Sequence, residues 1–291
     1  MKDHYSHFQE VVMTRRIILL LAALLASPVS SRAQTTILVT QSQAGDFVGG
    51  GVDRTFTEAD GTFTATRNFS GVTIQFHDPS FSHFWMLDFA AAGGVPLTPG
   101  VYENAVRFPF QPVDQPGLSV VGEGRSCNQL TGRFEVLEVT FGSDQLVSSF
   151  AATFEQHCEG NPPALLGAIL INANAPVPPQ LNITLVGCLH CHAGDHLIAQ
   201  VTLRNPGTTA TTVEIKAGLR LPNGTGVSLF GPNGQHIVVS LAAGMEATFP
   251  ILNLTWPAGA PPGAWRVEGT LLEPSLGRTF SRDVRLFEVE P

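Results

Sequence analysis

Lysine and long apolar runs are the two features that this sequence most clearly lacks. Only two of its 291 residues are lysine, Lys2 and Lys216, and 14% of the residues are charged, against about 25% in an ordinary soluble domain. The formal net charge is −8. Nucleic acids and anionic lipids attract basic surfaces, so both are disfavoured as partners.

The longest apolar run is too short to cross a bilayer. It extends from Ile17 to Ala26 behind two arginines, and it falls short of the roughly 18 residues that a membrane-spanning helix requires. Small residues then supply a cleavage site at Ser31-Arg32-Ala33. Residues 1–33 are therefore predicted to form a secretory signal peptide, with translation starting at Met13.

Removal of this signal leaves a chain with 12 basic and 22 acidic residues. No later apolar run is long enough for a transmembrane segment. We expect a secreted, periplasmic or cell-surface protein in an oxidising compartment, where disulfides form and persist.

Helical periodicity is also missing, because no segment repeats apolar residues every 3.6 positions. Short runs such as Gly71–Phe76 and Arg133–Val139 instead alternate apolar and polar residues, which is typical of strands. The sequence predicts an all-β protein with two antiparallel β-sandwich or barrel domains. Residues 36–172 form the first domain, 173–179 a proline-rich linker, and 180–291 the second domain.

The second domain has a more specific prediction. About seven short alternating runs occupy its length, and turn sequences such as Asn205-Pro206-Gly207 and Pro261-Pro262-Gly263 separate them. Seven short strands in about 100 residues favour an immunoglobulin-like sandwich. Trp265, in a run after one of these turns, is expected to fill its core.

Cysteine is scarce, with four residues that fall into two pairs. Cys127 and Cys158 each border a predicted strand of the first domain and enclose a hairpin between them. In an exported β-protein this arrangement predicts a disulfide. A closed loop of about 30 residues stabilises the fold by roughly 3–4 kcal/mol in the chain-entropy model.

The second pair lies in Gly187-Cys188-Leu189-His190-Cys191-His192. A disulfide between Cys188 and Cys191 is the preferred interpretation, because the expected compartment is oxidising. Two alternatives remain open. Cys188, Cys191, His192 and His196 could bind zinc, and Cys-x-x-Cys-His is the attachment sequence for c-type haem. The preferred interpretation requires no cofactor.

No catalytic motif such as Gly-x-Ser-x-Gly, His-Glu-x-x-His or a P-loop occurs in the chain. His77, Asp78 and His83 could do general acid–base work in a hydrolase, but an exposed loop is the simpler interpretation of this segment. If the protein has a ligand surface, loop residues are the natural contributors. The candidates are Phe81, His83, Trp85 and Tyr102.

The first domain contains the motifs Gly45-Asp46-Phe47-Val48-Gly49-Gly50-Gly51, Gly100-Val101-Tyr102, Ser126-Cys127-Asn128, Gly132-Arg133-Phe134 and Phe154-Glu155-Gln156-His157-Cys158-Glu159-Gly160. Together they cover most of residues 44–172 and look like a domain of exported bacterial proteins of unknown function. The second block is similar to immunoglobulin-like modules appended to such proteins. The resemblance implies an extracytoplasmic β-protein and provides no catalytic residue.

The sequence thus favours an exported, non-enzymatic binding or adhesion protein associated with the cell envelope. Its expected partner is an envelope or extracellular protein or polysaccharide. The alternative is a monohaem c-type, redox or metal protein that uses Cys188, Cys191 and His192.

Overall fold

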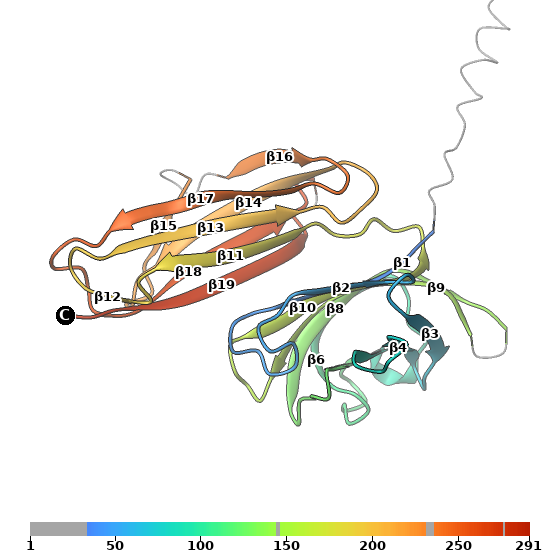
Figure 1. The fold of residues 1–291 in the computed structure, drawn as a ribbon. Helices are drawn as coiled ribbons and strands as arrows, with labels where there is room; N and C mark the ends of the chain where they lie inside the picture. Colours follow the sequence, from blue (N-terminus) through green and yellow to red (C-terminus); the bar gives the residue numbers. More distant parts are fainter. Residues whose placement is uncertain (1–33, 144–145, 231–235, 276) are drawn as a thin grey trace, which may run out of the picture. The chain divides into compact units, whose positions relative to one another are not determined.

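The structure is a computed structural model that describes residues 34–291 apart from 144–145, 231–235 and 276. The signal peptide predicted for residues 1–33 lies outside the described residues. Gln34–Pro291 forms one compact unit, built almost entirely from β-strands (Figure 1). The prediction of an all-β protein is confirmed. Within the described residues, no helix is long and apolar enough to cross a membrane.

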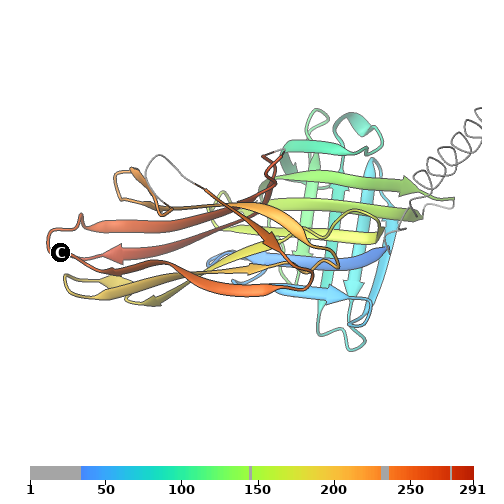
Figure 2. The same cartoon turned by 90° about the horizontal axis from the view of Figure 1, so that it is seen from above.

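Ten strands between residues 35 and 173 form one sheet, called here the N-terminal sheet. Its order is β2-β1-β10-β9-β8-β6-β7-β5-β4-β3, and Figure 2 shows its blue to green strands side by side. Neighbouring strands are antiparallel except for β6 and β7, which pair in parallel over two residues. The strands are β1 (Thr35–Ser42), β2 (Arg54–Thr57), β3 (Thr62–Arg67), β4 (Gly71–His77), β5 (Phe84–Ala90), β6 (Gly100–Arg107), β7 (Gly117–Gly122), β8 (Leu130–Phe141), β9 (Val147–Cys158) and β10 (Ala164–Ala173), with one short 3-10 turn at Ala92–Gly94.

The N-terminal sheet curls around its own core. Phe56 of β2 stacks on Phe76 of β4 with ring centroids 4.5 Å apart, although these strands are close to opposite ends of the sheet order. An isolated bridge between Thr66 and Leu146 also joins the β3 edge to the segment before β9. Curling lets one sheet bury its apolar face without a second layer.

A buried glutamine side chain supplies hydrogen bonds that β7 does not receive from a neighbouring strand. Strand β7 meets β6 only at its first two residues, so the peptide groups of Val120 lack a strand partner on that side. Gln156 of β9 is fully buried, and its amide accepts from the Val120 N–H at 2.8 Å and donates to the Val120 carbonyl at 2.9 Å. The side chain thus replaces a peptide group of the missing strand.

Residues 180–289 form a sandwich of two sheets, called here the C-terminal sandwich. The sheets have the orders β11-β13-β17 and β12-β19-β18-β14-β15, with β16 also paired to β14. With β11, β13 and β17 as strands A, B and E, and β19, β18 and β14 as G, F and C, this is the immunoglobulin-like arrangement. The strands are β11 (Gln180–Gly187), β12 (His190–Cys191), β13 (His196–Arg204), β14 (Thr211–Arg220), β15 (Gly226–Ser228), β16 (Ile237–Leu241), β17 (Glu246–Thr255), β18 (Gly263–Leu272) and β19 (Thr279–Val289).

Strand β13 shows how the sequence directs this packing. Leu197, Ala199, Val201 and Leu203 are buried and alternate with residues that face outward. They pack in one core with residues of the opposite sheet, including Trp265, which is 5% exposed. The expectation that Trp265 fills the core is confirmed.

Side chains of β19 close the edge of β11. Strand β11 is an edge strand of its sheet, so alternate N–H groups have no ladder partner. The hydroxyl of Ser281 accepts from the Leu181 N–H at 3.0 Å, and the carboxylate of Asp283 accepts from the Ile183 N–H at 2.7 Å. Burial raises the pKa of Asp283, while the adjacent Arg285 opposes that rise.

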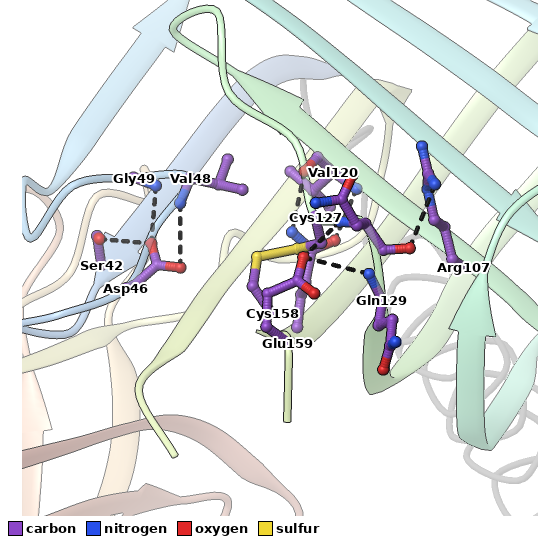
Figure 3. The surroundings of a disulfide bond; sticks show 12 residues. Ser42, Asp46, Val48, Gly49, Arg107, Val120, Cys127, Gln129, Cys158 and Glu159 are labelled. Atoms are coloured by element: carbon purple, nitrogen blue, oxygen red, sulfur yellow. Dashed lines mark hydrogen bonds between the residues drawn. A yellow bond between two sulfur atoms is a disulfide. The ribbon is translucent and has the colours of Figure 1, made fainter. Parts of the chain in front are cut away.

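Both predicted disulfides are present. Cys127 is bonded to Cys158 and Cys188 to Cys191. Figure 3 shows the first bond together with Glu159, whose carboxylate accepts from the N–H groups of Asn128 and Gln129. Glu159 therefore fastens the chain beside the first disulfide to strand β9.

We expect Gln156→Leu to lower the free energy of unfolding by about 2–4 kcal/mol, because both peptide groups of Val120 would then be buried without partners. Urea denaturation of the oxidised protein measures the change. The matched control is Gln75→Leu on the exposed face of β4, for which we expect less than about 0.5 kcal/mol. Equal effects of the two substitutions would contradict the role assigned to Gln156.

Candidate functional site

The turn before β5 is organised by one carboxylate. Asp78 accepts hydrogen bonds from the backbone N–H of His83 at 2.8 Å and from the hydroxyls of Ser80 and Ser82. These bonds, that of Ser80 most of all, hold the pKa of the Asp78 carboxyl well below its usual range. Asp78 thus shapes the turn, and no hydrogen bond joins its carboxylate to the His83 ring.

The ring of His83 pairs with Glu123. Its Nδ1 atom lies 3.1 Å from both carboxylate oxygens. The indole N–H of Trp85 donates to the same carboxylate at 2.9 Å, and a guanidinium nitrogen of Arg54 lies 3.8 Å from it. These four residues, here called the rim cluster, surround one carboxylate with three donor groups.

The predicted ligand residues reach different environments. Trp85 is 0% exposed, so its ring belongs to the core and its place on a ligand surface is corrected. Phe81 is 67% exposed and stacks on His77. Tyr102 stacks on Phe134 at 4.6 Å, and its hydroxyl donates to the carbonyl of Thr98. The four side chains therefore do not form one surface.

The glycine-rich motif forms the loop that leads to Arg54. Asp46 is buried and accepts from the Ser42 hydroxyl and the Gly49 N–H, each at 2.7 Å (Figure 3). Gly50 has a φ of +69°, and a Cβ there would lie 2.6 Å from a guanidinium nitrogen of Arg125. The positive φ favours glycine at this position, and any other residue there would also displace the flexible Arg125 side chain. The hydrogen bonds of Asp46 thus hold this loop in a defined conformation ahead of β2.

The second cysteine pair does not offer metal ligands in this state. Both sulfur atoms belong to the disulfide, whereas zinc and haem attachment each use reduced cysteine. His192 faces Glu290 at 3.3 Å, and His196 pairs with Asn253 at 2.7 Å. The described part of the chain contains no group of three or more His, Cys, Asp or Glu residues that could hold a metal ion.

The structure also contains a polar cleft of about 550 Å³. It lies between β1 and β2 on one side and β11, β13 and β17 on the other. Every side chain of its lining is polar. The lining residues are Thr40, Gln41, Asp53, Arg54, Thr55, Gln180, Asn182, Thr202, Arg204 and Glu246.

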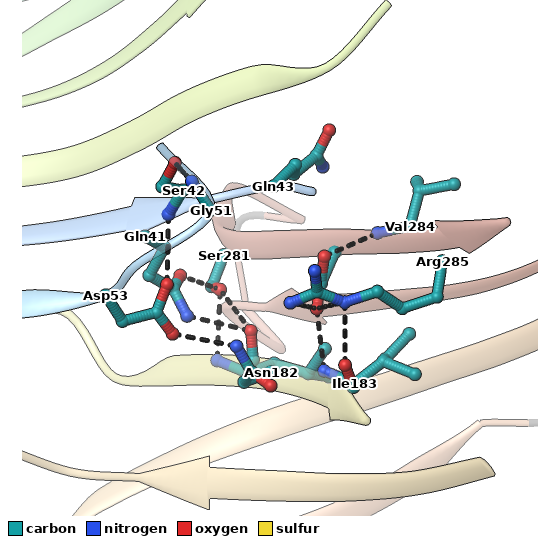
Figure 4. Close-up of polar contacts among 12 residues, drawn as sticks. Gln41, Ser42, Gln43, Gly51, Asp53, Asn182, Ile183, Ser281, Val284 and Arg285 are labelled. Carbon is teal, nitrogen blue, oxygen red and sulfur yellow. Dashed lines mark hydrogen bonds and ion pairs between the residues drawn. The ribbon is translucent and has the colours of Figure 1, made fainter. Parts of the chain in front are cut away.

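Hydrogen bonds connect the two walls of the polar cleft. The amide of Asn182 donates to Asp53 at 2.7 Å, and Figure 4 shows these side chains beside Gln41. The amide of Gln41 donates to the Leu181 carbonyl at 2.8 Å, and its oxygen accepts from the Ser281 hydroxyl. The same Ser281 closes the edge of β11, so the cleft wall is fixed to a buried network.

The polar cleft is lined by two carboxylates and two guanidinium groups, of which Arg204 and Glu246 are exposed. Arg204 lies 3.8 Å from Glu246, and both side chains are about half exposed or more. Arg204 also donates to the Thr55 hydroxyl at 3.3 Å. An exposed pair at this distance contributes little to stability, so these groups are able to exchange partners.

The polar cleft is not evident from the sequence alone. Its residues come from separate segments around 40–55, 180–182, 202–204 and 246. Each one reads as an ordinary outward-facing polar residue of a strand or turn. The sequence shows that polar residues alternate with apolar ones in β11 and β13. It does not show that their outward-facing side chains lie opposite β1 and β2.

Comparisons with known proteins give no identity. No protein-family profile matches the chain, and a search of curated proteins found no match. Solved structures with some likeness include Bacteroides uniformis beta-glucuronidase, at 11% identity and a TM-score of 0.31 over 70% of this chain. A calcium-binding mutant of Bacteroides uniformis beta-glucuronidase 2 gives 10% identity and a TM-score of 0.32 over 85%. This chain spans only 26% and 31% of their lengths.

We expect Glu123→Ala to lower the free energy of unfolding by about 2 kcal/mol, because the buried indole N–H of Trp85 would lose its acceptor. Glu123→Gln should cost less than half as much, since its amide oxygen can still accept that hydrogen bond. Chemical denaturation of the three proteins gives the comparison. A Gln variant as unstable as the Ala variant would show that charge, and not the Trp85 bond, dominates.

A second histidine pair predicts a pH dependence. A hydrogen bond from His157 to Glu155, at 3.1 Å, raises the pKa of His157 above 6.5 and lowers that of Glu155 below 4.5. The stabilisation from His157 is therefore complete below about pH 6.5 and is lost as the pH rises through its raised pKa. The stabilisation from Glu155 is present above about pH 4.5 and is lost as the pH falls through its lowered pKa.

Wild type should therefore exceed Glu155→Gln in unfolding free energy by up to about 1 kcal/mol near pH 5.5. The difference should shrink by pH 8.5. Urea denaturation at both pH values measures it, and a difference that grows with pH would contradict the assignment.

Proposed function

We propose that the chain is an exported, non-enzymatic binding protein that holds its ligand in the polar cleft. The observation that carries the proposal is a hollow of about 550 Å³ that is lined by polar residues. Ligand sites commonly have volumes of about 300–1,000 Å³. A hollow of this size, lined by side chains that can form hydrogen bonds, is suited to binding.

The lining residues support binding more than catalysis. No histidine, cysteine or serine is among the described residues that line the polar cleft. Of its two carboxylates, Asp53 accepts from the Ser42 N–H at 2.9 Å and from Asn182, and Glu246 faces Arg204. Nucleophilic catalysis relies on a nucleophile beside a base, and these side chains instead pair with donors.

The proposed location of the protein is outside the cytoplasm. Two disulfides are compatible with an oxidising compartment, and the negative net charge disfavours nucleic acid. The proposed partner is an envelope or extracellular polysaccharide or protein. The rim cluster contributes to the proposed site through Arg54, which lines the cleft and is the first residue of β2.

The test is a variant that fills the polar cleft. Thr202→Trp should abolish retention of the oxidised protein on immobilised envelope polysaccharide and on secreted proteins, because the indole would occupy the ligand's space. Thr64→Trp, on the exposed face of β3, is the matched control and should be retained like wild type. Retention of the Thr202→Trp protein at the wild-type level, with an unchanged melting temperature, would contradict the proposal.

A further inference from the structure

We infer that the polar cleft binds a neutral, hydroxyl-rich oligosaccharide. The inference deepens the proposed function and rests on it, since it names the class of ligand for the same site. Three observations carry it: the polar residues that line the walls, their balanced charge, and the closure of the adjacent strand edge.

The walls exclude an apolar ligand. Pockets for apolar small molecules are lined mainly by hydrophobic and aromatic side chains, whereas this lining consists of amides, hydroxyls, carboxylates and guanidinium groups. Desolvating such groups against an apolar surface would leave them unpaired at about 1–3 kcal/mol each. The ligand must therefore offer hydrogen-bonding groups over most of its surface.

The charge of the walls favours a neutral ligand. Asp53 and Glu246 are matched by Arg54 and Arg204, so an anionic ligand would meet two carboxylates and a cationic ligand two guanidinium groups. A hydroxyl group both donates and accepts. Neighbouring sugar hydroxyls can donate to Asp53 or Glu246 and accept from Asn182 or Arg204 without introducing charge.

The edge of β11 argues against a peptide ligand. An extended peptide gains affinity chiefly by adding a strand to an open sheet edge. The N–H groups of Leu181 and Ile183 on that edge are already bound by Ser281 and Asp283, and Gln41 covers the Leu181 carbonyl. Strand addition at this wall is therefore blocked, and side-chain hydrogen bonding is the mode that remains.

The position of the Arg204–Glu246 pair suits a ligand that enters from solvent. The two groups lie 3.8 Å apart, a separation that an incoming hydroxyl can bridge. Glu246 is 62% exposed at its side chain, so its replacement should leave the fold intact. It is therefore the residue of choice for a binding test.

The experiment is isothermal titration of the oxidised protein with defined probes. These are cello-, manno- and xylo-hexaose as neutral oligosaccharides, an oligogalacturonide as an acidic one, and an unstructured hexapeptide. At least one neutral probe should bind with a Kd of about 1 mM or tighter. Glu246→Gln and Asn182→Ala should each weaken this binding at least about tenfold, which corresponds to about 1.4 kcal/mol.

Melting temperatures of both variants check that the fold is retained, and Thr64→Ala is the control that should bind like wild type. Binding of only the acidic probe or only the peptide, if lost in Thr202→Trp, would overturn the neutral-glycan inference and leave the proposed function intact. Binding that Thr202→Trp does not affect would overturn both. Failure of all three neutral probes to bind would overturn the inference.

Discussion

The edge of strand β11 has no neighbouring strand, and the polar cleft depends on how side chains pair the backbone groups of that edge. An edge strand exposes N–H and carbonyl groups that must be paired or hydrated. Here Ser281 and Asp283 bind two of these N–H groups, and Gln41 of β1 completes the network through Ser281 and the Leu181 carbonyl (Figure 4). The interaction that satisfies the edge also positions the wall that carries Asn182.

Several motifs that the sequence analysis singled out in the first domain have structural roles. Gln156 substitutes for a missing strand at Val120, Cys158 forms a disulfide, and Asp46 holds the glycine-rich loop. These residues pair backbone groups and hold loops of the curled N-terminal sheet. These motifs therefore stabilise the N-terminal sheet, and the proposed ligand site uses other residues.

Much of the fold was predictable because strand alternation and turn residues are local signals. The two cysteine pairs, the core position of Trp265 and the immunoglobulin-like architecture of the second block followed from spacing and composition. The assignment of Trp85 to a surface was wrong because its neighbours in the aromatic segment do not reveal which face of β5 is covered. The role of Glu123 and the polar cleft were not predictable, because their residues are distant in sequence. Glu123 meets Trp85 through the pairing of β5 with β7, and the cleft joins residues of the N-terminal sheet to residues of β11, β13 and β17.

The most direct test of the account is amide chemical-shift mapping of the oxidised protein, labelled with ¹⁵N, during titration with the neutral hexasaccharides. The account predicts that the largest shifts fall on lining residues of β11 and β13, including Asn182 and Thr202, and on Asp53. Shifts confined to the turn at residues 78–83 and to Glu123, with none along these strands, would contradict it.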